Sequence, residues 1–347
     1  MPPLVPLLAG WLGFAAFTVL SPASPHWLVP VIAVIFVAAL GVLHHAEKLA
    51  HLLGDPLGTL VLTLSIVGME VTLLAAVLFG PGEHDTVARD STMAAAILFL
   101  GLFLGAAVLM GTLRHGTLTF NERGVSAYLT MLIVFGALTF ALPGLIGVDG
   151  SFTGPQAVVV IVLTAGAYAF FLWRQMTGQA EDFREVVPVE QGDQTSSGPA
   201  WRHAVLLLLT AAPIVLLSHD MATLLDTALT RVSAPAALSG MAVATIVMLP
   251  EGITTLRAAW NGEIQRVYNL TYGAMVSVVG LTVPTVLTIG LLTGQRIVFA
   301  ESAVNLMLLA VLALLAVAVL AGRRVTPLHG LAHLVLGAVY LLSVFSG

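Results

Sequence analysis

Two glutamates lie inside long hydrophobic stretches of this chain. Glu70 falls within the apolar run 57–80, and Glu251 follows Pro250 within the apolar run 235–259. An ionisable side chain at membrane depth is costly, and by default it marks an ion path, a proton relay or a partnered site. Because a carboxylate can hold either a metal cation or a proton, this pair predicts a site where cations and protons compete.

The composition predicts a polytopic membrane protein. Of the 347 residues, 58% are hydrophobic and 9% are charged, and the mean hydropathy is +1.01, whereas soluble domains are roughly 25% charged. The absence of cysteine excludes a disulfide framework and a thiolate metal site. No Lys or Arg precedes the first apolar run, so we expect that run to be a true span rather than a cleaved signal peptide.

The hydrophobic segments predict eleven transmembrane helices, at about 20 residues per span. We therefore expect an all-α polytopic membrane protein. The spans are predicted at 4–20, 27–50, 57–80, 91–113, 125–146, 155–174, 201–218, 235–259, 267–292, 299–320 and 327–345. The segment 220–231 is expected to form a short amphipathic helix at the membrane interface.

The distribution of Lys and Arg predicts the orientation. On this layout Arg89, Arg231 and Arg296 fall on one side of the membrane, and the other ten of the thirteen fall on the side of the N-terminus. Positive residues concentrate on the cytoplasmic side. We therefore expect the N-terminus in the cytoplasm and the C-terminus outside.

The layout also predicts an internal repeat. An N-terminal transmembrane helix (1–24) precedes a first five-helix repeat (25–174), an acidic cytoplasmic linker (175–199) and a second five-helix repeat (200–347). Repeats with an odd number of helices insert with opposite topology, as in many secondary transporters. Glu70 and Glu251 each lie in the second helix of a repeat, which predicts that they meet near the bilayer midplane.

Two carboxylates alone are too few ligands for calcium, which takes about six to eight oxygens. Pro250 removes a backbone donor and frees carbonyl oxygens one turn earlier, and glycines beside the glutamates leave room for close approach. The candidate supporting ligands are Ser65, Gly68, Thr245, Val247, Asn269 and Ser277. The polar side chains among them can instead be plain interhelical hydrogen bonders.

Competition for shared oxygens predicts an exchange mechanism. Burial favours the neutral acid, whereas a bound cation favours the carboxylate. The site then holds protons or metal in turn. If only these two loaded states permit rocking between inward-facing and outward-facing forms, transport is obligatorily coupled.

Two groups of motifs stand one in each half of the chain. The first is the run from His45 to Leu60, followed by the run from Leu64 to Val71. The second comprises Leu249 to Gly252, Ala258 to Asn261, Gln265, Arg266, Asn269, Leu270, Gly273 and Gly280 to Pro284. The two groups resemble the two signatures of the CAX branch of the calcium/cation antiporter superfamily, and in particular the bacterial ChaA-type calcium (sodium, potassium)/proton antiporters.

This resemblance implies an eleven-helix fold, an acidic central linker, and Glu70 and Glu251 as the cation and proton carboxylates. It also implies a location in the bacterial inner (plasma) membrane. The implied partners are protons, the lipid bilayer and Ca²⁺, or else Na⁺ or K⁺. Calcium is a transported substrate, no cofactor is implied, and no nucleic acid is expected to bind.

The sequence departs from that family at the site. Typical CAX members carry a Gly-Asn-Ala run before each glutamate, but here positions 66–69 read Ile-Val-Gly-Met and positions 247–250 read Val-Met-Leu-Pro. The loss of the asparagine amide leaves fewer side-chain oxygens. A monovalent cation/proton antiporter with little Ca²⁺ activity is therefore the alternative.

Histidines cluster at the end of the second predicted span. His44, Glu47 and His51 recur at three- and four-residue spacing, and imidazole titrates near neutral pH. They could form a cytoplasmic vestibule that attracts cations or senses pH. The other interpretation is an interfacial helix end in which Glu47 pairs with a neighbouring cationic side chain.

Two other function classes fit less well. A membrane-embedded enzyme is disfavoured because the chain has no His-Glu-x-x-His zinc motif and no nucleotide-binding glycine loop. A passive cation channel, in which acidic residues line a continuous pore, is the remaining alternative. We expect a secondary transporter rather than an enzyme.

Overall fold

The computed structural model describes residues 4–20, 24–53, 57–79, 85–184, 199–231 and 237–346. A helix occupies each of the predicted ranges. The α-helices are α1 Leu4–Leu20, α2 Leu28–Leu53, α3 Leu57–Leu78, α4 Val87–Ile97, α5 Leu104–His115, α6 Glu122–Gly136, α7 Leu142–Ile146, α8 Gly154–Met176, α9 Ala200–Arg231, α10 Ala237–Trp260, α11 Ile264–Thr293, α12 Ala303–Gly322 and α13 Pro327–Ser346. The helices α4 and α5 together form one span, and α6 and α7 together form another.

Short helical segments complete the fold. The 3-10 helices η1 Pro25–Trp27 and η4 Ala180–Phe183 precede α2 and follow α8. The π-helical segments η2 Leu98–Phe103 and η3 Ala137–Ala141 join α4 to α5 and α6 to α7. Among the described residues, eight helices are long and apolar enough to cross a membrane. The structure is therefore all-helical there, as expected for a polytopic membrane protein.

The α9 helix differs from the prediction. We expected a span at 201–218 and a separate interfacial helix at 220–231, but Ala200–Arg231 is one continuous helix of 32 residues. No glycine or proline separates the two parts. Met221, Leu224 and Leu225 are buried, so the second part packs into the protein instead of lying at a membrane surface.

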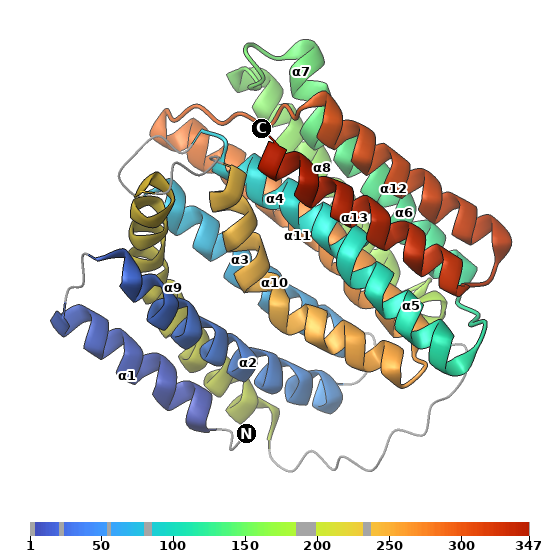
Figure 1. The fold of residues 1–347 in the computed structure, drawn as a ribbon, viewed down its shortest axis with the longest axis horizontal. Coiled ribbons are helices and arrows are strands. Elements are labelled where there is room, and N and C mark those ends of the chain that lie inside the picture. The colour runs from blue at the N-terminus through green and yellow to red at the C-terminus, as the bar shows by residue number, and fades with distance from the viewer. Residues whose placement is uncertain are drawn as a thin grey trace.

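The third predicted span of each half lies at the centre of the bundle. The span formed by α4, η2 and α5 and the span formed by α11 are each 72% buried, more than any of the other six. Around them, α3 and α8 pack against α11, while α10 and α13 pack against α4 and α5 (Figure 1). The first helices of the two halves, α2 and α9, pack against each other.

Local sequence signals set several helix ends. The Asn121 side chain accepts hydrogen bonds from the backbone amides of Arg123 and Gly124 at the start of α6, and Ser302 accepts one from Asn305 at the start of α12. Such caps satisfy amides that lack a partner in the first turn. Gly294 ends α11 in the left-handed conformation, which glycine adopts without steric cost.

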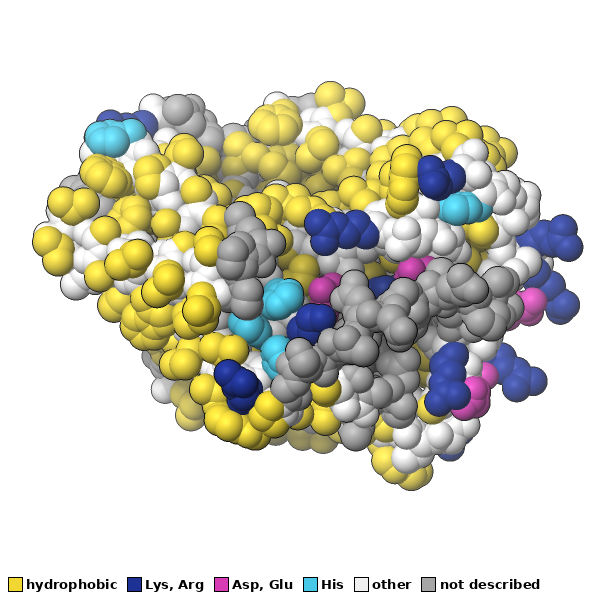
Figure 2. Space-filling model, turned by 90° about the horizontal axis from the view of Figure 1, so that it is seen from below, with side chains coloured by type: hydrophobic (Ala, Val, Ile, Leu, Met, Phe, Trp, Pro, Cys, Tyr) yellow, Lys and Arg dark blue, Asp and Glu magenta, His cyan; other side chains and the backbone are white. Residues whose placement is uncertain are grey.

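Charged side chains gather at one end of the bundle. The face in Figure 2, below the view of Figure 1, carries clusters of Lys, Arg and His side chains, with hydrophobic side chains around them.

Candidate functional site

The two glutamates occupy adjacent helices in the interior. Glu70 on α3 is 0% exposed and Glu251 on α10 is 1% exposed. The two helices are in contact, and the two acids are near enough to interact electrostatically. Neither side chain faces the lipid. The sequence therefore placed both acids in the interior correctly, and the packing of α3 on α10 brings them together.

The carboxyl oxygens stand out among the buried polar atoms. Both oxygens of Glu70 and Oε2 of Glu251 are buried and have no hydrogen-bond partner among the described residues. A buried polar atom without a partner costs free energy, so each such atom calls for an explanation, of which a bound ion or water is one. Carboxylate oxygens suit a proton or a hard cation such as Ca²⁺ or Na⁺.

The α10 helix carries a proline and is closely packed beside Glu251. Pro250 lies inside the helix and cannot donate a hydrogen bond to the carbonyl one turn before it. A methyl group at Gly252 would overlap the ring of Phe103 in η2. The absence of a side chain at Gly252 therefore lets α10 pack closely on η2 at the level of the glutamate.

The backbone of α3 is less crowded beside Glu70. A methyl group at Gly68 would meet nothing within 4 Å, and the Thr72 hydroxyl donates to the Gly68 carbonyl at 2.7 Å. Gly68 is therefore not a packing contact, in contrast to Gly252.

Three of the predicted supporting hydroxyls bond to their own helix. Ser65 donates to Val61, Thr245 to Met241 and Ser277 to Gly273, at 2.6, 2.7 and 2.8 Å. These bonds use the hydroxyl hydrogen, so oxygen lone pairs remain for a cation. The predicted ligand at Val247 is its backbone carbonyl, which stays a prediction, and the Val247 side chain lies outside the described side chains.

Asn269 makes structural contacts at the beginning of α11. Its amide donates to the Phe183 carbonyl at 2.6 Å and accepts from the Gln265 amide at 3.0 Å. Gln265 in turn accepts from the Asn121 backbone amide at 2.7 Å. These contacts hold the first residues of the linker against α6 and α11, and they occupy the polar atoms expected to assist the site.

The histidine cluster includes a residue that the sequence analysis did not single out. His44 and Glu47 are partly exposed on the last turns of α2, while the His51 side chain lies outside the described side chains. The buried His45 contacts His203 of α9, with 3.4 Å between their Nδ1 atoms. Histidines thus connect the first helices of the two halves, which no local spacing could predict.

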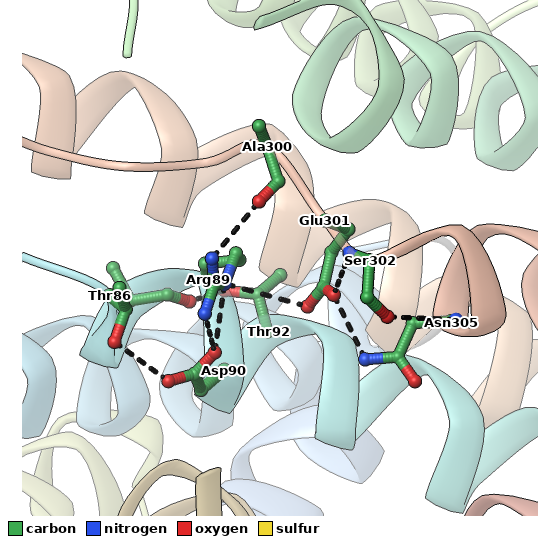
Figure 3. Close-up of polar contacts among 9 residues, drawn as sticks. Thr86, Arg89, Asp90, Thr92, Ala300, Glu301, Ser302 and Asn305 are labelled. Carbon is green, nitrogen blue, oxygen red and sulfur yellow. Dashed lines mark hydrogen bonds and ion pairs between the residues drawn. The ribbon is translucent and has the colours of Figure 1, made fainter. Parts of the chain in front are cut away.

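A second polar cluster lies where α4 and α12 begin (Figure 3). Arg89 pairs with Asp90 at 2.8 Å, lies 3.7 Å from Glu301 and donates to the Ala300 carbonyl at 3.0 Å. Asn305 donates to Glu301 at 2.9 Å. Glu301 lies just before α12. Its pairing with Arg89, which is far away in the chain, could not be predicted from the sequence because only the fold brings the two side chains together.

No metal centre made of protein side chains alone is present in the described part of the chain, where no three His, Asp or Glu residues are grouped suitably. Any cation bound at Glu70 and Glu251 must therefore take its remaining ligands from hydroxyls, backbone carbonyls or water.

Comparisons with known proteins fit this arrangement. The family described as sodium/calcium exchanger protein matches residues 23–177 and 202–346, well over half of the chain. This chain belongs to the sodium/calcium exchanger family. The exchanger is 31% identical over 337 residues to the sodium-potassium/proton antiporter ChaA of Escherichia coli (strain K12), covering 93% of this chain and 92% of that one.

Solved structures show the same fold. The exchanger superposes on a Ca²⁺/H⁺ antiporter protein YfkE with a TM-score of 0.74 and 12% identity, covering all of both chains. It superposes on the H⁺/Ca²⁺ exchanger CAX with a TM-score of 0.70 and 15% identity, covering 98% of this chain and 87% of the other. The predicted resemblance to ChaA-type antiporters is confirmed, and the fold is that of cation exchangers.

Proposed function

We propose that the exchanger is a secondary active cation/proton antiporter in which Glu70 and Glu251 bind cation and proton in turn. The observation that carries this proposal is the pair of buried acids on contacting helices, whose oxygens include three without a hydrogen-bond partner among the described residues. An isolated buried carboxylate is strongly disfavoured. Two protons or one divalent cation neutralise the pair, whereas the empty, doubly charged state is avoided.

Alternating access between two repeats provides the movement. Support for two inverted repeats comes from mirrored packing, because α3 packs on α11 as α10 packs on α4, and α8 packs on α11 as α13 packs on α5. The family match likewise falls into one stretch on each side of the linker. In this proposal eleven spans, α1 plus five in each repeat, surround a site at the pseudo-twofold axis.

The proposed substrate is cytoplasmic Ca²⁺, and the monovalent ions Na⁺ and K⁺ are the second candidate. Two carboxylates match a divalent charge. The second candidate rests on the relative that is named for sodium and potassium, and on the lack of an asparagine beside each glutamate. Competition among the three ions in proteoliposomes with an imposed proton gradient distinguishes the candidates.

Substitution of each acid tests the mechanism. Glu70→Gln and Glu251→Gln keep the side-chain shape but lose the exchangeable charge, so cation-dependent proton movement in proteoliposomes should fall to the level of empty liposomes. Glu122→Gln removes an acid that is 43% exposed and should transport normally. Wild-type exchange by either buried variant removes that residue from the mechanism.

A further inference from the structure

An apolar groove enters the protein between α6 and α12, which contact each other (Figure 1). Its volume is about 370 Å³. Ile133 at its mouth is 46% exposed, whereas Tyr272 and Met275 of α11 at its inner end are buried. The groove therefore runs from the surface that faces lipid to the central helix of the second half.

Small side chains create this space. Gly136, Ala137, Ala310 and Ala313 line it where α6 passes into the π-helical η3. The one histidine of the lining, His333, donates through Nδ1 to the Leu100 carbonyl at 2.6 Å. That bond satisfies the nitrogen nearest η2. The lining is otherwise hydrocarbon except for the Tyr272 hydroxyl, and such a surface favours an apolar occupant over water.

The same two helices form a polar pocket one turn further along. Leu129 and Ala316 line the apolar groove, while Ser126 and Leu320, three and four residues away, line the polar pocket. Apolar groove and polar pocket thus follow one seam. Its polar end lies where α6 begins and α12 ends.

Positive charge is in excess at that polar end. Arg123 lines the pocket with the acids Glu122 and Asp182, and Arg323 lies 3.5 Å from Glu122. Arg324 follows directly and is exposed. Among the described residues at this end, these three arginines face two acids, and Glu181 is paired with Arg184. The described charge is therefore net positive at the end of an apolar groove, which is the pattern of a phospholipid site between transmembrane helices.

We propose that the seam between α6 and α12 binds an anionic diacyl phospholipid, with one acyl chain in the groove and the phosphate at Arg123, Arg323 and Arg324. The acyl chain then packs against α11, whose face toward α3 belongs to the proposed transport site. The lipid site does not depend on that function, so it can be measured without transport.

Native mass spectrometry of the purified full chain tests the proposal. We expect the wild-type protein to retain phosphatidylglycerol in preference to phosphatidylcholine. Replacing all three arginines by glutamine should lower the retained phosphatidylglycerol at least about fivefold, because the loss of even one basic contact weakens lipid binding by about that factor. Ala313→Phe should fill the groove and lower retention of both lipids.

A matched control uses Arg202→Gln, because Arg202 is exposed at the start of α9, which does not pack on α6 or α12. This variant should retain lipid as the wild type does. Equal retention of the two lipids, or unchanged retention by the triple arginine variant, overturns the proposal. A dimer that excludes lipid and whose contact is abolished by Ala313→Phe overturns it as well, since a second copy then covers the seam.

Discussion

The buried acids of this exchanger differ in what surrounds them. Glu70 and Glu251 have three oxygens without hydrogen-bond partners among the described residues, whereas Glu301 accepts from Ser302 and Asn305 and lies near Arg89. A satisfied carboxylate holds its position, while an unsatisfied one is available for exchange. At the scale of single residues, this difference separates the proposed transport site from the cluster at the start of α12.

Glu301 provides a prediction of pH dependence. Burial raises its pKa above the ordinary value of 4.5, although hydrogen bonds from Asn305 and Ser302 and the nearby Arg89 act in the opposite direction. The folded protein thus binds this proton more tightly than the unfolded chain. Relative to Glu301→Gln, the wild-type protein should lose stability as the pH rises from 4.5 to the folded pKa, and no further above it.

Thermal unfolding in detergent at a series of pH values measures this difference. The control is Glu181→Gln, because the Glu181 side chain is 77% exposed and pairs with a partly exposed arginine. That variant should follow the wild-type pH profile. Parallel pH profiles for the wild-type protein and Glu301→Gln would show that folding does not raise the pKa of Glu301.

At the scale of elements, glycines decide how closely helices approach. Gly252 lies against the ring of Phe103, whereas a methyl group at Gly68 would meet nothing within 4 Å. Each glycine lies near one of the two glutamates, but only Gly252 makes a close packing contact. A side chain at position 252 would therefore disturb the contact of α10 with η2, whereas one at position 68 would not disturb a contact of α3.

Gly252→Ala should destabilise the protein by about 1–3 kcal/mol, the usual effect of overpacking a tight contact. Gly68→Ala should leave the stability unchanged or slightly raised, because alanine favours helix and meets no neighbour. Thermal unfolding of the two variants side by side measures the contrast. Equal destabilisation would show that the α10–η2 contact is not as tight as described.

The Arg89 cluster links α4 to the segment before α12, and its charges are mutually dependent. Arg89→Gln should destabilise the protein by about 2–3 kcal/mol, because it leaves the Asp90 and Glu301 carboxylates, 8% and 3% exposed, without their cation. Adding Glu301→Gln should restore part of the loss, as measured by thermal unfolding. If the double variant is less stable than Arg89→Gln alone, the pairing with Glu301 is not what stabilises this junction.

At the scale of the whole molecule, the orientation can be tested with single cysteines, since the chain contains none. Arg184 and Arg296 are matched in exposure, at 51% and 50%, but we expect them on opposite sides of the membrane. A membrane-impermeant maleimide should label Arg296→Cys in intact cells and Arg184→Cys only after permeabilisation. The reverse pattern would invert the proposed orientation.

The sequence by itself determined the membrane setting, the helix positions and the two acids. Spans are decided locally, because about 20 apolar residues must be buried in lipid wherever they occur, and an acid inside such a span is visible without any fold. The same local reasoning failed for α9, where tertiary burial of Met221 and Leu224 extended the helix beyond the predicted interfacial break.

Only the tertiary structure decided which side chains meet. The packing of α3 on α10 brings Glu70 to Glu251, α2 on α9 joins His45 to His203, and the start of α4 beside α12 joins Arg89 to Glu301. These partners are more than 150 residues apart in the chain. Hydrophobic patterns state which face of a helix is buried but not against which helix, because apolar surfaces are interchangeable until glycines and polar pairs select the partner.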